Sequence, residues 1–290
     1  MDLGDAKLRP LKVLGSGSFG RVFLCLQREG CRQRKVCVKR IIIRNAKNEL
    51  ALIKEEIYII SQLRHPHIVQ FIRHFMHAGT VNIVMEYVPN GTMRNVIERM
   101  RERGGGGLEQ SRLLRYFTDM ILGLEYLHIR HVIHRDIKPE NMLLDAQDRV
   151  KFADFGISNI HTPAKLLPWQ VLGTPLYMAP EIMCGGKCDF KSDLWSLGLV
   201  LYELCVGRNP FISVLDPNAR FEQVHSVIKA MSRPKLDCQL MRQRYDAVWP
   251  RICESMVVYD QEQRICLPDI FCMDPFVTLT IYKQYFNYKY

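Results

Sequence analysis

Acidic, basic and amide side chains lie together in the eight residues from His134 to Asn141, which read His-Arg-Asp-Ile-Lys-Pro-Glu-Asn. Thirteen positions after Asn141 comes Asp154, at the end of the strand-length run 149–153. Asp and Asn oxygens presented from two neighbouring loops suit the hard oxygen coordination that Mg²⁺ requires. Asp136, on the first loop, would then be left to face an incoming hydroxyl group.

Each of these residues also has a purely structural interpretation. An aspartate in a loop is most often a turn or capping residue, and a histidine before Arg-Asp can belong to the core. Taken alone, His134, Asp136 and Asn141 therefore do not indicate catalysis. Their interpretation depends on the order and spacing of the other motifs.

Length and hydrophobic content allow a sizeable core. The 290 residues, 48% of them hydrophobic, suit one large domain or two lobes that share an interface. No run approaches the roughly 18 apolar residues of a transmembrane helix, and residues 1–5 lack the basic-then-apolar order of a signal peptide. We expect an intracellular, chiefly cytoplasmic protein without membrane association, and nuclear or cytoskeletal association is also compatible.

The ten cysteines are scattered, and several lie in apolar runs, as Cys25, Cys37 and Cys205 do. Cys184 and Cys188 have the spacing of half a zinc knuckle, but the sequence has no second Cys or His pair at matching spacing. We interpret the thiols as reduced and structural, and expect no zinc.

The net charge of +10 does not by itself identify a partner. Basic residues alternate with acidic and apolar ones, and the densest group, at 28–40, falls in an expected strand-turn-strand. The positive electrostatic potential of such a chain would also favour binding of ATP or of acidic partners. We expect no nucleic-acid partner.

Residues 11–43 alternate apolar runs with glycine-rich or charged turns, which predicts three antiparallel strands, at 11–14, 21–27 and 36–43. The first turn holds Gly15, Gly17 and Gly20, where the backbone could approach phosphate oxygens closely. A glycine pattern of this kind is common by chance. Here a strand follows it in place of a helix, which argues against a Rossmann site.

Lys39 lies on the third expected strand, and Arg40 beside it faces the other way because strand side chains alternate. We expect Lys39 to point inward toward phosphates and Arg40 to be the exposed one. Residues 46–63 carry apolar residues at 3-4-3 spacing, which predicts an amphipathic helix. Its acids that could pair with Lys39 are Glu49, Glu55 and Glu56.

Taken in order, these motifs resemble the protein kinases, over roughly residues 8–277. The resemblance implies an α+β, bilobal fold, with a small antiparallel sheet and one main helix in the N-lobe and a larger, mainly helical C-lobe. We expect one kinase domain over 1–290. Its parts would be the N-lobe 1–84, the hinge 85–91, the C-lobe 92–277 and an aromatic tail 278–290.

The resemblance also implies roles for the site residues. Asp136 would accept the proton of the acceptor hydroxyl, and Asn141 and Asp154 would hold Mg²⁺, with Mn²⁺ as an alternative ion. Lys138 and Lys39 would oppose the phosphate charge. Counting back from Leu63–Pro66, the family's glutamate aligns with Glu56, and Glu55 is the alternative partner of Lys39.

ATP would be held mainly by the glycine-rich turn and the hinge. The hinge backbone at Glu86 and Val88 would hydrogen-bond adenine, with Met85 as gatekeeper. Cys37 stands where the family usually has a small alanine, which would alter nucleotide packing slightly. The expected nucleotide contacts are Leu14, Gly15, Gly17, Gly20, Val22, Cys37, Lys39, Glu56, Met85, Glu86, Val88 and Leu143.

The segment Gly173–Glu181 resembles the substrate platform of serine/threonine kinases. Lys138 agrees with this, and Thr174 could bridge it to Asp136. Thr92 stands where arginine-directed kinases often have glutamate, while Glu140 and Glu203 are retained, and no substrate consensus follows from this.

A nearly all-apolar helix is expected from Ser192 onward. Asp193 could cap it and, as in kinases, brace the catalytic-loop backbone, while Arg264 matches the arginine that pairs with Glu181. The run Lys191–Cys205, with Asn209–Phe211 after it, resembles the NIMA-related kinases.

The function implied is in-line transfer of the γ-phosphoryl group of Mg-ATP to serine or threonine hydroxyls of proteins. One alternative is a catalytically idle kinase fold used as a scaffold, which loss of Lys39, Asp136 or Asp154 would favour. A small-molecule kinase is another, and the platform segment argues against it. The sequence does not indicate a regulator.

The activation segment has few hydroxyls. Between Asp154 and Thr174 the sequence offers only Ser158 and Thr162, and Arg135 has no evident anionic partner. We hypothesise that apolar packing around Trp169 holds this segment in place of phosphorylation.

Overall fold

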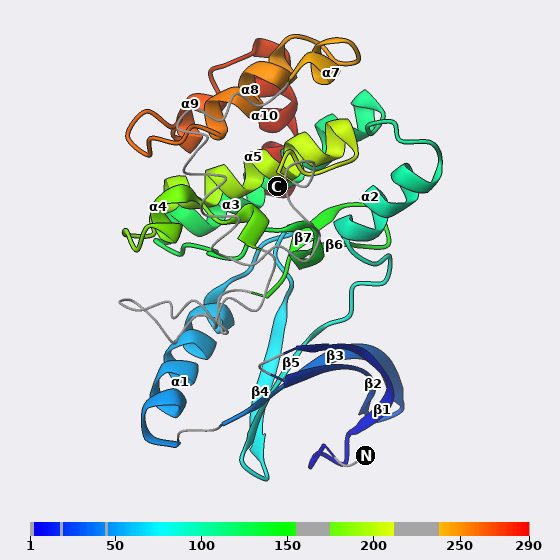
Figure 1. Ribbon diagram of the computed structural model, residues 1–290. Helices are drawn as coiled ribbons and strands as arrows, with labels where there is room; N and C mark the ends of the chain where they lie inside the picture. Colours follow the sequence, from blue (N-terminus) through cyan, green and yellow to red (C-terminus); the bar gives the residue numbers. More distant parts are fainter. Residues whose placement is uncertain (1–2, 18–19, 44–45, 155–174, 212–237, 290) are drawn as a thin grey trace.

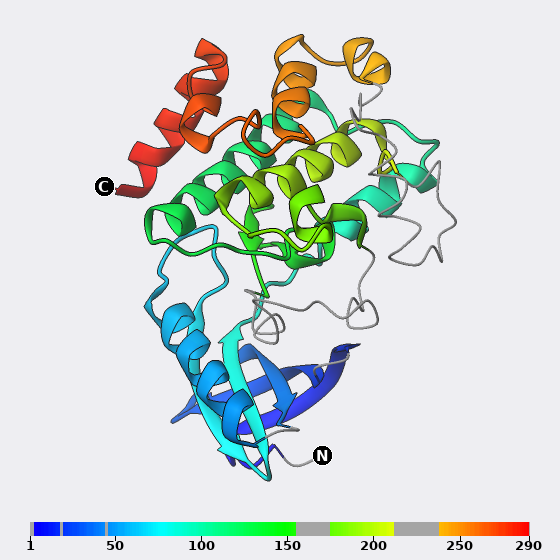
Figure 2. The ribbon, with the colours of Figure 1, turned by 60° about the vertical axis from the view of Figure 1, so that its left-hand side comes forward.

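A computed structural model describes residues 3–17, 20–43, 46–154, 175–211 and 238–289. An antiparallel sheet with one long helix forms the N-terminal part, and helices form most of the remainder (Figures 1 and 2). The predicted α+β class is therefore confirmed.

The N-terminal sheet has the strand order β1-β2-β3-β5-β4, with every neighbouring pair antiparallel. The three strands predicted from the sequence are present. They are longer than predicted, since the β2–β3 ladder continues to the pair Glu29–Arg32. Backbone pairing needs no apolar side chain, so the charged end of this hairpin carried no alternation to detect. The strands are β1 Leu8–Gly17, β2 Gly20–Glu29, β3 Arg32–Ile42, β4 Phe71–His77 and β5 Thr80–Glu86.

Helix α1, Ala46–Gln62, confirms the predicted amphipathic helix and contacts β4 (Figure 1). Ile53, Ile57 and Ile60 are buried, and Leu50 is half-buried against the same core. One apolar stripe therefore attaches the helix to the sheet.

The helical part is built around α3, Gln110–Ile129, and α5, Phe190–Val206. The central residues of α5 are almost all buried, as the apolar run predicted. A small antiparallel pair, β6 Met142–Leu144 and β7 Val150–Phe152, lies against α3. The other α-helices in the described part of the chain are α2 Met93–Glu102, α4 Pro180–Met183, α7 Gln239–Arg242, α8 Val248–Met256, α9 Leu267–Ile270 and α10 Pro275–Lys289.

The expected capping of α5 by Asp193 is wrong. The helix begins three residues earlier, and Asp189 is its cap, accepting hydrogen bonds from the Lys191 and Ser192 amides at 2.8 and 3.2 Å. The Asp189 amide in turn donates a hydrogen bond to the Ser192 hydroxyl oxygen at 3.2 Å. This reciprocal pair satisfies the first turn and leaves Asp193 available for other contacts.

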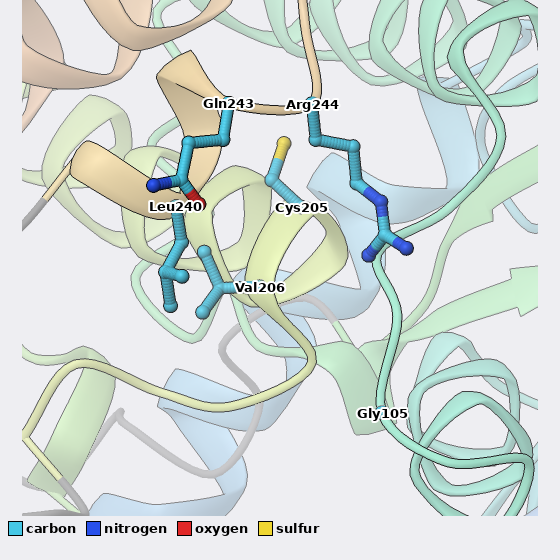
Figure 3. A pocket seen from close by; sticks show the side chains of 6 residues that line it. All are labelled: Gly105, Cys205, Val206, Leu240, Gln243 and Arg244. Atoms are coloured by element: carbon cyan, nitrogen blue, oxygen red, sulfur yellow. The ribbon is translucent and has the colours of Figure 1, made fainter.

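The glycine stretch 104–107 connects α2 to α3 and closes tightly on the end of α5. A Cβ atom on Gly107 would lie 1.9 Å from the carbonyl oxygen of Cys205, so this position requires glycine. A cavity of about 360 Å³ opens beside it (Figure 3). The cavity is lined by Gly105, Cys205, Val206, Leu240, Gln243 and Arg244. None of these is a predicted site residue.

The C-terminal segment packs on the helical part. Helix α10 contacts α3, buries Ile281, and places the Gln284 amide 2.5 Å from an Asp119 carboxylate oxygen. The helix runs through the expected boundary between residues 277 and 278. Among the described helices, none is both long and apolar enough to cross a membrane.

Candidate active site

Asp193 holds the backbone that precedes Asp136. Its two carboxylate oxygens accept hydrogen bonds from the amides of His134 and Arg135, both at 2.9 Å, and His128 Nε2 lies 3.0 Å away. Arg135 has a left-handed backbone, with φ of 68°, which is uncommon for a bulky residue. The predicted brace is therefore confirmed, and it secures a strained turn directly before Asp136.

His134 is a core residue. Its ring is fully buried and lies 5.4 Å from the ring of Phe152. Burial lowers the pKa of His134 and outweighs the nearby carboxylates of Asp193 and Asp136, which act to raise it. The structural interpretation of this histidine is thus the correct one.

Asp136 is held from two sides and still reaches solvent. Lys138 Nζ lies 2.8 and 2.9 Å from its carboxylate oxygens, and the Asn141 amide donates to Oδ2 at 2.7 Å and to the main-chain oxygen at 2.8 Å. About a third of the Asp136 side chain (31%) stays exposed. The carboxylate is therefore oriented and accessible, as a proton acceptor must be.

Asp154 joins the two parts of the molecule. Its Oδ1 lies 2.6 Å from Nζ of Lys39 on β3, and the amide of Ala153 donates to the Asn141 carbonyl at 2.8 Å. Burial would raise the pKa of Asp154, but the charge and hydrogen bond of Lys39, aided by Lys138, lower it below its usual value. Asp154 is therefore ionised at neutral pH.

Asn141 and Asp154 fit a hard divalent cation. Because the Asn141 nitrogen is directed to Asp136, its side-chain oxygen is the atom available to a cation, and Asp154 adds a carboxylate. Within the part of the chain that the structure describes, no three His, Cys, Asp or Glu side chains form a metal-binding group. An ion held by two protein oxygens would need further oxygen ligands, which suits an ion that also binds phosphate.

The expected partner of Lys39 on α1 is not among the described contacts. The side chains of Glu49, Glu55 and Glu56 lie outside the described residues, so the choice of Glu56 stays a prediction. Arg40 does face away from Lys39, but it is half-buried, not fully exposed. It donates to the Asn82 side chain at 3.0 Å and lies over the Phe23 ring.

The glycine-rich turn joins β1 to β2, with Gly17 paired to Gly20. Gly20 has φ of 147°, and a Cβ there would lie 1.8 Å from the Arg40 carbonyl oxygen, so no other residue fits. Val22 pairs with Gly15 on one side and Lys39 on the other. This register brings the expected phosphate and nucleotide contacts onto adjacent strands.

The remaining expected nucleotide contacts that are described lie on β1, β3, β5 and β6 or just after β5. Cys37 pairs with Met85 in the sheet, and burial raises the pKa of its thiol to about 12, so it stays protonated. Leu14 is exposed on β1, Val88 is buried just after β5, and Leu143 lies on β6.

Glu86 uses its side chain for structure. One carboxylate oxygen accepts from Lys151 Nζ and from the Gln70 amide, both at 2.8 Å. The end of β5 is thereby tied to β7 of the helical part. Lys151 was not singled out from the sequence, since a lysine on a short strand has no local signal that identifies its distant partner.

The platform segment is secured by the predicted Glu181–Arg264 pair. The Arg264 guanidinium, itself buried, donates to the two carboxylate oxygens at 2.8 and 2.9 Å, and the Ser192 hydroxyl adds a bond at 2.7 Å. The expected bridge from Thr174, and the hypothesis about Ser158, Thr162 and Trp169, concern residues outside the described ranges.

Comparison with known proteins decides the family. The family model described as "Protein kinase domain" matches residues 8–277. The chain belongs to the protein kinase family. The predicted bilobal kinase fold is therefore confirmed, and the family implies ATP and a divalent metal ion.

Three relatives agree with this assignment. Serine/threonine-protein kinase Nek3 of Mus musculus is 35% identical over 201 residues, which are 69% of this chain and 38% of the relative. Nek5 of Homo sapiens is 36% identical over 204 residues, 69% of this chain and 28% of the relative. CBL-interacting protein kinase 25 of Oryza sativa subsp. japonica is 32% identical over 268 residues, 90% of this chain and 49% of the relative.

The expected resemblance to the NIMA-related kinases is confirmed by the Nek relatives. The chain spans between 28% and 49% of the length of the three relatives described above.

Proposed function

We propose that this domain transfers the γ-phosphoryl group of ATP to serine or threonine hydroxyls of protein substrates. The supporting observation is the convergence of five polar side chains from both parts of the molecule. Lys39 meets Asp154 at 2.6 Å, and the Asp154 loop is bonded through Ala153 to the loop that carries Asp136. The convergent residues are Lys39, Asp136, Lys138, Asn141 and Asp154.

Asp136 orients the acceptor hydroxyl and takes its proton as the phosphoryl group is transferred. Lys138, within hydrogen-bond distance of Asp136, opposes the negative charge on the transferred group. Lys39 positions the other phosphates. Positioning and charge neutralisation by these fixed side chains contribute most of the rate in phosphoryl transfer.

Asn141 and Asp154 would hold the divalent ion, which we propose to be Mg²⁺, with Mn²⁺ as an alternative. When bound, the ion neutralises charge on the phosphate oxygens. The nucleotide would lie against Leu14, Gly15, Gly17, Gly20 and Val22 of the first two strands. Its further contacts would be Cys37, Lys39, Glu56, Met85, Glu86, Val88 and Leu143.

The domain limits follow from the same proposal. The N-lobe would comprise 1–84, the hinge 85–91, the C-lobe 92–277 and the tail 278–290. A catalytically idle scaffold is disfavoured because the lysine, the proton acceptor and the metal aspartate are all retained.

Radiolabelled ATP and a panel of protein, peptide and metabolite hydroxyls test the activity. The wild type should label serine or threonine in proteins, and Asp154→Ala should lower the rate by at least about a hundredfold. Glu102→Ala, which removes an exposed acid on α2, should match the wild type. Equal activity of wild type and Asp154→Ala would refute the proposal, as would transfer confined to small metabolites.

Control of the activation segment needs a separate experiment. We propose that the segment works without phosphorylation, on the basis of its few hydroxyls before Thr174. Intact mass and activity are measured before and after phosphatase treatment, and activity should be retained. Loss of activity together with loss of a phosphate from residues 155–174 would contradict this.

A further inference from the structure

Arg94 on α2 binds three acceptors from distant parts of the chain. Its Nε lies 2.8 Å from a Glu140 carboxylate oxygen, Nη1 lies 2.7 Å from Glu203, and Nη2 donates to the Tyr177 hydroxyl at 2.6 Å. Three of the donor directions of one guanidinium are therefore matched by three oxygens. This geometry is specific for a planar, multiply donating cation.

The three acceptors form a negatively charged pocket. The Glu203 carboxylate is fully buried and also accepts from the Tyr177 hydroxyl, whereas Glu140 is 46% exposed at the rim. Burial would lower the pKa of the Arg94 guanidinium, but Tyr177, Glu203 and Glu140 outweigh it and raise that pKa. Without a cation in the pocket, the buried Glu203 carboxylate would keep its hydrogen bond from Tyr177 but would lack an opposite charge, which is strongly unfavourable.

The place of Arg94 in its helix does not explain these contacts. It is the second residue of α2, after the cap Thr92, and the first turn of that helix contains no acid. A cation near a helix N-terminus is opposed by the helix dipole. The arginine is therefore held there by the pocket.

The pocket lies beside the catalytic loop. Glu140 directly precedes Asn141, whose side chain holds the Asp136 carboxylate, and Tyr177 ends the short helix Pro175–Tyr177 of the platform. An acceptor hydroxyl at Asp136 would bring its flanking residues past these groups. The chain's own arginine thus fills a site whose outer acid, Glu140, faces solvent.

We propose that Arg94 determines substrate specificity by occupying the acidic pocket of Glu140, Glu203 and Tyr177. An arginine at the substrate position next to this pocket therefore gives a protein substrate no advantage. The proposal rests on the proposed kinase activity. Removing the Arg94 side chain should convert the pocket into a binding site for a substrate guanidinium. Arg94 itself touches no reacting atom, and its role is to define what binds next to them.

A peptide scan tests the change in preference. One acceptor peptide is varied by placing arginine or alanine at each of the four positions on either side of the acceptor. For the wild type, no position should give more than about a threefold advantage to arginine in kcat/KM. For Arg94→Ala, one position should give an advantage of at least about tenfold.

A binding measurement tests the pocket independently of phosphoryl transfer. Methylguanidinium chloride at low millimolar concentration should raise the melting temperature of Arg94→Ala by about 2 °C or more, relative to sodium chloride at equal ionic strength. The wild type should show no such difference. Arg101→Ala, which removes an exposed arginine from the same helix, should behave as the wild type in both experiments.

Adding Glu203→Gln to Arg94→Ala should abolish the new preference and the methylguanidinium effect, because the buried charge is lost. If Arg94→Ala does not fold in plain buffer, Arg94→Met, which keeps the apolar stem, takes its place. A folded variant of either kind with unchanged preference and no methylguanidinium binding overturns the inference. Recovery of folded protein only in the presence of methylguanidinium supports it.

The two proposals fail in different ways. If neither wild type nor variant transfers phosphate, but methylguanidinium stabilises the variant alone, the proposed pocket is supported and the proposed kinase activity is refuted. If both transfer phosphate with the same peptide preference and neither binds methylguanidinium, the proposed kinase activity is supported and the proposed role of Arg94 is refuted.

Discussion

Asp193 illustrates how single buried carboxylates organise this site. Both of its oxygens are used, one on each of two consecutive amides, and the second of those amides belongs to the left-handed residue Arg135. A backbone in that region costs roughly 1–3 kcal/mol and persists only where its surroundings hold it. Asp193 provides such a constraint for the turn that precedes Asp136.

Replacing Asp193 by alanine should therefore affect catalysis more than nucleotide binding. The buried His134 amide would lose its acceptor, at about 1–3 kcal/mol, the part-buried Arg135 amide would lose its acceptor at a smaller cost, and the Asp136 side chain would no longer be held in position. We expect kcat to fall at least about tenfold, while ATP affinity measured by calorimetry changes little. An unchanged kcat in a folded Asp193→Ala protein would show that the brace does not position Asp136.

At the scale of elements, the start of α5 separates capping from catalysis. Asp189 satisfies the first turn of this buried helix, and Asp193, four residues later, reaches the catalytic loop. The aspartate before the helix and the aspartate in its first turn thus have different tasks. The difference arises because a capping residue must lie outside the helix, where its side chain can turn back onto free amides.

Asp189→Ala should reduce stability without impairing the site. The loss of a cap costs about 0.5–2 kcal/mol, and urea denaturation should show it as a lower midpoint with an unchanged slope. Because the Asp193 contacts remain, kcat should stay within about twofold of the wild type. A drop in kcat as large as that of Asp193→Ala would contradict this division of tasks.

At the scale of the whole molecule, ion pairs link segments that are far apart in the sequence. Lys39 and Asp154 join the sheet to the helical part, and Glu181 and Arg264 join the platform to a loop near the C-terminus. The Arg264 side chain is fully buried in this second pair. Breaking such a pair leaves an uncompensated charge and costs about 3–5 kcal/mol.

The Glu181–Arg264 pair should make stability depend on pH in one direction. Burial would raise the pKa of Glu181, but the hydrogen bonds and charge of Arg264 lower it in the folded state. The pair therefore stabilises the fold fully above the unfolded pKa of about 4.3, and this contribution is lost as the pH falls through the folded pKa.

Stability curves of wild type and Glu181→Gln from pH 8 to pH 3 test this dependence. The difference in free energy of unfolding between the two proteins should be constant down to about pH 5 and shrink below about pH 4. A difference that grows on acidification would show that the sign is wrong.

The C-terminal helix contributes to the same core. Ile281 is 1% exposed against the helical part, so Ile281→Ala should cost about 2–5 kcal/mol of stability. Leu279 on the same helix is 52% exposed, and its replacement by alanine should cost less than about 0.5 kcal/mol. Thermal denaturation of the two variants compares them directly, and equal losses would mean that α10 is not docked as described.

The amino-acid sequence by itself determined the order of the motifs, and with it the family and the kind of chemistry. Local periodicity was sufficient for α1 and the first three strands, because apolar side chains must share one face of an element to be buried. Pairs that the family arrangement implies, such as Glu181 with Arg264, were also predictable. The roles of Asp136, Asn141 and Asp154 in catalysis remain proposals that the experiments above decide.

Only the tertiary structure decided which polar groups meet. Lys39 contacts Asp154, 115 positions away in the chain, and Arg94 fills a pocket whose members lie 46 to 109 positions from it. The choice of Asp189 over Asp193 as the cap was likewise not visible in the sequence pattern. The physical reason is that a hydrogen bond requires a separation near 3 Å, and for distant residues that separation is set by the packing of whole elements.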